Sequence, residues 1–173
     1  MKVDICLPIY NEQAILMNNC RRLLDFCQQQ NFAFNWQIII LVNGSTDNSW
    51  PLAQNLVRQF PDLLIAKNYQ LPGKGRALKN YGYECQADLL VYLDIDLAAD
   101  LNQLPALIDY LEDYDLVLGS RLLPKSRTQR SLLRELTSRA YNFLSRLILG
   151  HQLSDLQCGF KAIRLPVFKT LLP

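Results

Sequence analysis

Two aspartates stand at the end of an apolar run in the segment VYLDIDLAADL, which extends from Val91 to Leu101. A single residue separates Asp94 from Asp96, so both side chains can face one crevice if the chain turns there. Converging carboxylates are costly unless a cation lies between them, and hard divalent cations prefer oxygen ligands. Acids that follow a strand also act as helix caps, which is the role expected for Asp100. The pair therefore predicts either a divalent-metal site or two caps.

Two further segments have the composition of a phosphate site. The sequence GKGRA, residues 73–77, offers flexible backbone N–H groups, a helix N-terminus and the charge of Lys74. Arg121 follows another apolar run, and Arg134 and Ser138 lie four residues apart on one face of a predicted helix. A guanidinium and a hydroxyl placed in this way can bind a phosphate. Each segment also fits a simpler interpretation, as a glycine-rich turn with a solvated lysine or as a solvated basic face.

Charge is unevenly distributed along the chain, which has 173 residues and a formal net charge of +2. Residues 121–146 contain seven cations and one acid, so this segment carries +6 and the remainder carries −4. Such an asymmetry indicates an anionic partner for one region rather than a generally basic protein. We expect no nucleic-acid partner.

The composition also argues against several kinds of site. The five cysteines are scattered and never spaced as CxxC, which predicts buried reduced thiols rather than disulfides or a zinc knuckle. His151 is the single histidine of the sequence, so a triad or multi-histidine metal site would have to be built around it. No apolar stretch is long enough to span a membrane, and Asp4 interrupts any signal peptide, which predicts a cytoplasmic chain.

Short apolar runs alternate with longer segments of helical period, which is the pattern of βαβ units around a mostly parallel sheet. This pattern predicts a single α/β domain over residues 1–173, with helices flanking the sheet. The sequence ends in apolar residues within a predicted helix, so we expect a truncated chain. Strands are expected at residues 3–9, 36–42, 63–67, 89–94, 115–120 and 159–164, and helices at 13–30, from about 48, at 75–86, 101–111 and 131–149, the last ended by Gly150.

Ligands of open α/β sheets bind at the carboxyl ends of the strands, so the loops at those ends are the expected site. Each of these loops is rich in polar or glycine residues. Chemistry there must rest mainly on carboxylates and cations. The loops read PIYNE, NGSTDNS, NYQLPGKGRA, DIDLAAD and GSRLLPKSR after the first to fifth expected strands.

Seven motifs, in one order along the chain, resemble the family 2 glycosyltransferases of the GT-A fold, particularly those that use polyprenyl phosphates. Two of them, GKG and DLQCGFK, are most similar to dolichyl-phosphate β-glucosyltransferase and less so to dolichyl-phosphate mannose synthase. The motifs are LPIYNE (residues 7–12), NGSTD (43–47), GKGRA (73–77), DID (94–96), GSR (119–121), SRAYNFLSRLILG (138–150) and DLQCGFK (155–161).

The resemblance implies transfer of a hexose from a nucleotide sugar to a polyprenyl or dolichyl phosphate, with inversion at the anomeric carbon. It favours UDP-glucose as the donor, with GDP-mannose or another sugar as the alternative. It also implies Mg²⁺ or Mn²⁺ as cofactor and a position at the cytoplasmic face of a membrane, whose anionic surface the basic segment would favour. Residues implied in donor binding are Pro8, Tyr10, Glu12, Asn43, Asp47, Lys74 and Asp94.

The same resemblance assigns the remaining roles in the reaction. Asp94 and Asp96 would hold the metal, and Asp155 would orient the sugar or assist as a base. The acceptor phosphate is already an anion near neutral pH, so it needs orientation more than it needs a strong base. The residues implied in holding that phosphate are Arg121, Arg134 and Ser138.

Three positions depart from the family pattern. Val42 and Asn43 stand where many relatives have an acidic pair before GS, which puts contacts to the base in doubt. Ala98 cannot supply the side-chain metal ligand that some mannose synthases have two residues after the second aspartate. Water, the diphosphate or another residue would then complete the metal shell. We expect His151 to be a loop residue rather than the late histidine ligand of other GT-A enzymes.

Two other classes of α/β protein remain as alternatives. A nucleotidyltransferase normally has a glycine-rich loop with Thr and Arg after its first strand, and PIYNE is not that loop. A receiver-like signalling domain without transferase activity has its acidic pair after the first strand, where this chain has only Glu12. Such a domain also has no use for the basic helix.

Overall fold

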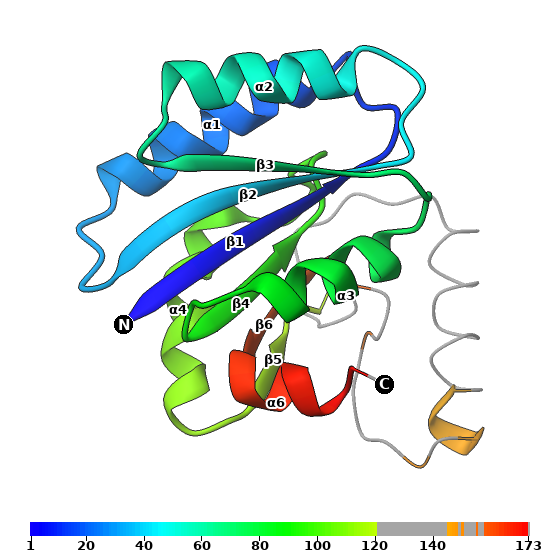
Figure 1. Cartoon of the computed structure of the whole chain (residues 1–173). Coiled ribbons are helices and arrows are strands. Elements are labelled where there is room, and N and C mark those ends of the chain that lie inside the picture. Colours follow the sequence, from blue (N-terminus) through cyan, green and yellow to red (C-terminus); the bar gives the residue numbers. More distant parts are fainter. Residues whose placement is uncertain (121–144, 149, 151–154, 156–157, 173) are drawn as a thin grey trace, which may run out of the picture.

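The computed structural model describes residues 1–120, 145–148, 150, 155 and 158–172. The described strands form one six-stranded sheet in the order β3-β2-β1-β4-β6-β5 (Figure 1). Strands β1 to β4 are parallel to one another, whereas β6 is antiparallel to both of its neighbours. The strands are β1 (Lys2–Ile9), β2 (Asn35–Asn43), β3 (Leu64–Tyr69), β4 (Leu89–Leu93), β5 (Leu116–Leu118) and β6 (Phe160–Arg164).

Helices cover both faces of this sheet (Figure 1). Helices α1, α2 and α4 pack on one face, and α3 and α6 pack on the other. Because a helix joins each successive pair of the parallel strands β1 to β4, the carboxyl ends of these strands meet at one edge of the sheet. The helices are α1 (Leu16–Gln29), α2 (Ser49–Gln59), α3 (Lys74–Glu84), α4 (Leu104–Asp109) and α6 (Leu165–Thr170), with short 3-10 helices η1 (Leu101–Gln103) and η2 (Tyr110–Glu112).

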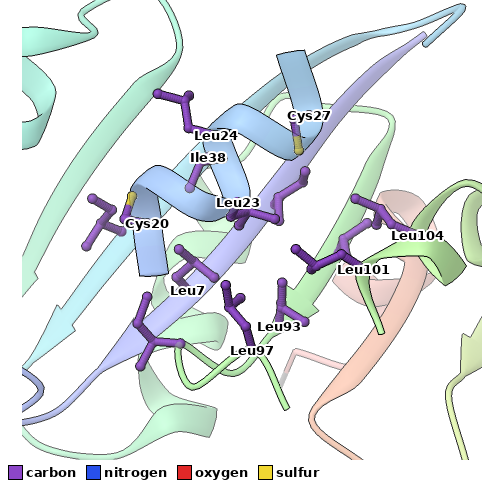
Figure 2. Packing of buried hydrophobic residues seen from close by; sticks show 14 of the residues in the cluster. Leu7, Cys20, Leu23, Leu24, Cys27, Ile38, Leu93, Leu97, Leu101 and Leu104 are labelled. Atoms are coloured by element: carbon purple, nitrogen blue, oxygen red, sulfur yellow. The ribbon is translucent and has the colours of Figure 1, made fainter. Parts of the chain in front are cut away.

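The core follows from the alternation of side chains along the strands, whose successive residues point to opposite faces. Ile5 and Leu7 of β1 belong to the layer beneath α1, whereas Cys6 belongs to the layer beneath α3. Figure 2 shows the first of these layers, in which Cys20, Leu23, Leu24 and Cys27 of α1 lie against Leu7, Ile38 and Leu93 of the strands and against Leu97, Leu101 and Leu104.

The predicted α/β class, with a mostly parallel sheet flanked by helices, is confirmed. All six predicted strands are present, with ends displaced by one or two residues, and the first three predicted helices are present as well. The single helix expected at residues 101–111 is wrong, because this segment is divided into η1, α4 and η2. Pro105 lies in the first turn of α4 and lacks the N–H that would join α4 to η1 in one helix.

Most of the helix expected at residues 131–149 lies outside the described residues. Residues 145–148 are helical, and Gly150, at φ 66°, donates its N–H to the carbonyl of Arg146 over 2.9 Å. A glycine in this conformation ends a helix, as expected. The predicted thiols are confirmed, since all five cysteines are free and buried. Within the described residues, no helix has both the length and the apolar character needed to cross a bilayer.

Candidate functional site

The ends of β1 and β2 and the start of α3 meet around the side chain of Asn43. This residue ends β2 and is buried. Its Nδ2 donates to the carbonyl oxygens of Ile9 (2.8 Å) and Leu41 (3.2 Å), and its Oδ1 accepts the N–H of Gly73 at 2.9 Å. Both amide atoms are engaged inside the protein. Asn43 therefore positions the loops around it, rather than presenting a free amide to a ligand.

The loops after β1 and β2 are joined by hydrogen bonds in both directions. Asp47 accepts the N–H of Gln13 at 3.0 Å and that of Ser49 at 2.9 Å, while Gln13 Oε1 accepts the N–H of Asn48 at 3.0 Å. Asn48 occupies the N-cap position of α2, but its side chain makes no capping bond. Burial acts to raise the pKa of Asp47, yet the hydrogen bonds donated by Ser49 and Gln13 outweigh it and lower the pKa. Asp47 is therefore a carboxylate that holds the two loops together.

The segment that carries the two aspartates is anchored by its alternate residues. Ile95 and Leu97 are buried, whereas Asp94 is half-buried and Asp96 is exposed. Figure 2 shows Leu97 within the layer beneath α1, and Asn19 of α1 donates to the carbonyl of Ile95 over 2.9 Å. Leu97 has φ 49°, a left-handed conformation that is uncommon for a leucine and that its burial maintains. The core thus fixes the backbone between the two carboxylates.

Three groups surround the carboxylate of Asp94. Lys74, the first residue of α3, places Nζ 2.7 Å from Oδ1, and the hydroxyl of Tyr92 donates to the same oxygen over 2.6 Å. Gly159 faces the other oxygen, since a Cβ on residue 159 would overlap Oδ2 and lie 2.5 Å from Cγ. The N–H of Asp94 also donates to the carbonyl of Gly159 over 3.1 Å. Lys74 and Asp94, both expected from the sequence to bind the donor, are thus in direct contact.

The two donors to Asp94 differ in how firmly they are held. Burial, and then the hydrogen bond to Asp94, raise the pKa of Tyr92 well above its usual range, so its hydroxyl remains a donor near neutral pH. The side chain of Lys74 is 56% exposed and that of Asp94 is 30% exposed. Ion pairs with this exposure contribute at most about 1 kcal/mol, so Lys74 can leave Asp94 for an incoming anion at small cost.

Asp96 lies on the solvent side of the same segment. Its Oδ1 accepts the backbone N–H of Ala98 at 3.1 Å, which closes a short turn after the aspartate. Asp100 accepts the N–H of Asn102 at 3.1 Å and caps η1, as expected. Among the described residues, no group of three or more His, Cys, Asp or Glu side chains is placed to hold a metal. Any metal at this edge would therefore take two protein carboxylates and complete its shell from elsewhere.

The other predicted site residues differ in their exposure, and some lie outside the described residues. Pro8 is buried in β1. Tyr10, which is 47% exposed, and Glu12, which is half-buried, follow β1 and are accessible at the carboxyl ends of the strands. Asp155 is buried, and its carbonyl accepts the N–H of Cys158 at 3.3 Å. The predicted acceptor residues Arg121, Arg134 and Ser138, as well as His151, lie outside the described residues.

Three residues that sequence reasoning missed shape this site. Tyr92 bonds Asp94, Gly159 lies against it, and Asn19 holds the carbonyl of Ile95. A signal for Tyr92 exists in the sequence, because residues two apart on a strand share a face. Gly159 and Asn19 carry no such local signal, since their contacts depend on how β6 and α1 are placed.

The protein-family model described as Glycosyl transferase family 2 matches residues 4–172 of the chain. The chain belongs to glycosyltransferase family 2. The family expected from the seven motifs is thereby confirmed.

Two curated glycosyltransferases of this family show the extent of the likeness. Glycosyltransferase AglD of Haloferax volcanii is 32% identical over 173 residues, which is 99% of this chain and 28% of that protein. Undecaprenyl-phosphate 4-deoxy-4-formamido-L-arabinose transferase of Salmonella choleraesuis is 29% identical over 175 residues, which is 99% of this chain and 51% of that protein. The chain thus spans about half, or less, of the length of these relatives.

Solved glycosyltransferase structures share the fold. The mannosyltransferase PcManGT of Pyrobaculum calidifontis, solved with GDP-Man and Mn²⁺, has a TM-score of 0.66 and 17% identity, over 98% of this chain and 46% of that one. Glucosyl-3-phosphoglycerate synthase of Mycobacterium tuberculosis was solved with Mn²⁺, UDP-glucose and phosphoglyceric acid. Its TM-score is 0.65 and its identity is 21%, over 96% of this chain and 57% of that one. The GT-A fold expected for this glycosyltransferase is confirmed.

Proposed function

We propose that this family 2 glycosyltransferase domain transfers a hexose from a nucleotide sugar to a polyprenyl phosphate, with inversion at the anomeric carbon. The observation that carries the proposal is the contact between Lys74 and Asp94, with Asp96 beside them, at the carboxyl end of β4. A cation for a diphosphate and carboxylates for a metal here occupy the edge where α/β sheets bind nucleotides. UDP-glucose is the proposed donor, favoured by the resemblance of DLQCGFK to the glucosyltransferase motif.

The donor set fits a divalent metal of the Mg²⁺ or Mn²⁺ type. Such ions are commonly held by one or two carboxylates, with substrate phosphates and water completing the shell. Asp94 and Asp96 supply two carboxylates, one half-buried and one exposed. A bound metal would supply positive charge that neutralises the leaving diphosphate. The exposed side of Asp96 leaves access for the remaining oxygen ligands.

The protein groups of the proposed site divide the binding of the donor between them. Lys74 moves from Asp94 to the diphosphate, where the N-terminus of α3 adds backbone N–H groups. A Cβ on Gly75 would meet nothing within 4 Å, so an anion can approach the backbone at this turn. The exposed Tyr10 and the half-buried Glu12 are proposed to line the base and ribose side of the donor, while Asn43 and Asp47 hold the loops in place.

The proposed reaction needs orientation of the acceptor more than it needs a strong base. An oxygen of the acceptor phosphate forms a bond to the anomeric carbon, and the bond from that carbon to the diphosphate breaks with its electron pair. The acceptor enters as an anion, so no proton has to be removed from it. Asp155 is proposed to orient the sugar, and Arg121, Arg134 and Ser138 to hold the acceptor phosphate at the cytoplasmic face of a membrane.

A transfer assay tests this proposal. The chain is incubated with labelled UDP-glucose or GDP-mannose, polyprenyl phosphate in lipid vesicles and Mn²⁺, and the label extracted into organic solvent is counted. We expect lipid label from UDP-glucose that EDTA abolishes. Label from GDP-mannose alone would correct the donor. No lipid label from any nucleotide sugar would overturn the proposed transferase activity.

A matched pair of aspartate variants tests the metal role. Asp96→Asn removes a carboxylate charge from the proposed metal site, whereas Asp100→Asn changes a helix cap in the same segment. We expect calorimetry to show Mn²⁺-dependent UDP binding in Asp100→Asn and none in Asp96→Asn. Wild-type binding by Asp96→Asn would remove the metal role of this residue.

A further inference from the structure

We propose that Tyr92 orients the carboxylate of Asp94 for binding of the metal. The inference rests on the proposed function, in which Asp94 and Asp96 hold the metal that neutralises the donor diphosphate. Tyr92 and Asp94 lie two residues apart, so they project from the same face at the end of β4. The hydroxyl of Tyr92 donates to Oδ1 of Asp94 over 2.6 Å. Tyr92 is therefore a positioning residue, which acts through Asp94.

The backbone contacts of Asp94 leave the torsion of its side chain unconstrained. Its N–H donates to the carbonyl of Gly159 and its carbonyl accepts the N–H of Leu97, both over 3.1 Å. These bonds fix where the carboxylate begins, at the junction of β4 and β6. Gly159 blocks one direction, because any further atom there would overlap Oδ2. The rotation that remains is limited by the donors to Oδ1.

Of the two donors to Oδ1, Tyr92 is the one that remains when a ligand enters. A carboxylate oxygen has two lone pairs, and Lys74 and Tyr92 occupy both positions on Oδ1. A cation that approaches this oxygen must take the place of Lys74, whose side chain is largely exposed. Tyr92 is half-buried and packs against the buried cluster beneath α3, of which Ala77 and Tyr81 are members. It can hold the carboxylate in the same direction before and after the exchange.

This arrangement separates the two parts of the tyrosine. The ring contributes to packing, and a phenylalanine would keep that contribution. The hydroxyl has a different effect, because groups that hydrogen-bond a metal ligand set its orientation, and their loss typically weakens metal affinity by about 10-fold to 100-fold. Tyr92→Phe is thus a conservative test of the hydroxyl alone.

Tyr69 provides a matched control. It lies at the end of β3 and also packs in the layer beneath α3, but its hydroxyl is buried without a hydrogen-bond partner among the described residues. Tyr69→Phe removes the same atom from the same layer without touching Asp94. Any effect common to the two variants is then an effect on packing.

The experiment measures Mn²⁺ binding by the full chain. Free Mn²⁺ is followed by electron paramagnetic resonance, first alone and then with UDP or GDP, and nucleotide binding in EDTA is measured by calorimetry. We expect Tyr92→Phe to weaken Mn²⁺ binding by about 10-fold or more, with nucleotide binding in EDTA unchanged. Tyr69→Phe should bind Mn²⁺ as the wild type does. Thermal melting shows whether each variant is folded, because a purely structural role would change melting without changing the Mn²⁺ affinity of the folded chain.

The outcomes distinguish this inference from the proposed function. Equal Mn²⁺ affinity in Tyr92→Phe and wild type would overturn the role of Tyr92 and leave the transferase proposal standing. An equal loss of Mn²⁺ affinity in Tyr92→Phe and Tyr69→Phe would also overturn the role of Tyr92, because a change in packing would then explain both losses. A wild-type chain that binds neither Mn²⁺ nor nucleotide, and transfers no sugar, would overturn the proposed function itself.

Discussion

Gly159 lies against the carboxylate of Asp94 with no room for a side chain between them. A Cβ at this position would overlap Oδ2 and lie 2.5 Å from Cγ. The glycine that precedes β6 is therefore part of the wall that shapes the carboxyl end of β4. Any larger residue must push the Asp94 side chain out of the direction in which Tyr92 holds it.

Gly159→Ala should accordingly weaken Mn²⁺ binding by about 10-fold or more, the range found when the support of a metal ligand is removed. Overpacking should also lower the free energy of unfolding by about 1–3 kcal/mol. Mn²⁺ titration and urea unfolding measure the two effects. Gly119→Ala is the control, since its Cβ would lie 3.3 Å from Cys158 Sγ and not against Asp94. If Gly159→Ala lost stability but kept its Mn²⁺ affinity, the claim that Gly159 sets the direction of the Asp94 carboxylate would be wrong.

Lys74→Met should change metal and nucleotide binding in opposite directions. In the structure Lys74 occupies Oδ1 of Asp94, so it competes with a cation when no nucleotide is present. The pair is exposed and is worth at most about 1 kcal/mol, which corresponds to a gain of up to about fivefold in Mn²⁺ affinity. Nucleotide binding in EDTA should weaken instead, because a cation for the diphosphate is lost. Calorimetry measures both constants.

Lys79→Met, on the same helix, removes an equal charge and serves as the control for net charge. If Lys74→Met bound Mn²⁺ more weakly than this control in the absence of nucleotide, Lys74 would be a partner of the metal site rather than its competitor.

Tyr81→Phe should destabilise the fold, because the hydroxyl of Tyr81 donates to Oδ2 of the buried Asp4 over 2.6 Å. The other oxygen of Asp4 has no partner among the described residues, and Cys85 adds only a thiol contact to Oδ2 at 3.3 Å. Losing a donor to a buried carboxylate costs about 1–3 kcal/mol in the free energy of unfolding. Urea unfolding measures it. Tyr69→Phe, which removes a buried hydroxyl without a partner there, should cost nothing, and an equal loss in both variants would point to packing alone.

Asp47→Asn should give a stability difference that depends on pH. Hydrogen bonds lower the pKa of Asp47 in the folded state from its ordinary value of 3.8. The ionised side chain therefore contributes to the free energy of unfolding at any pH above 3.8. The contribution is lost as the pH falls through the folded-state pKa. We expect the wild type to be the more stable protein near neutral pH, by less than about 1 kcal/mol, and the difference to vanish in acid. Urea unfolding across this range measures it, and a difference that stays constant would show that ionisation of Asp47 is not involved.

The elements of this protein were predictable because their signals are local. Strands such as β1 and β2 are short apolar runs, and α1 repeats its apolar residues at helical spacing. Parallel strands joined by helices then bring the strand ends together, which is why Lys74 and Asp94 could be expected in one site. The segment at residues 101–111 was misjudged because apolar period alone does not register that Pro105 interrupts the hydrogen bonds of a helix.

Side-chain roles within the site were less predictable. Asn43 and Asp47 were expected among the donor contacts, and the sequence could not show that Asn43 is buried with both amide atoms engaged or that Asp47 joins two loops. Polar residues at strand ends can face a ligand or satisfy the backbone of neighbouring loops. Which of these happens depends on the path of segments that are distant in sequence.

By itself the sequence determined the family, the α/β class and the edge of the sheet at which polar loops gather, since all three depend on motif order and on the period of apolar residues. Tertiary structure decided which atoms of distant segments contact the carboxylate of Asp94. Strand β6 enters antiparallel beside β4, and this pairing brings Gly159 to the carboxylate, while the packing of α3 brings Lys74 to it. Hydrogen-bonded strand pairing and helix packing act between residues far apart in the chain, so no local pattern specifies them.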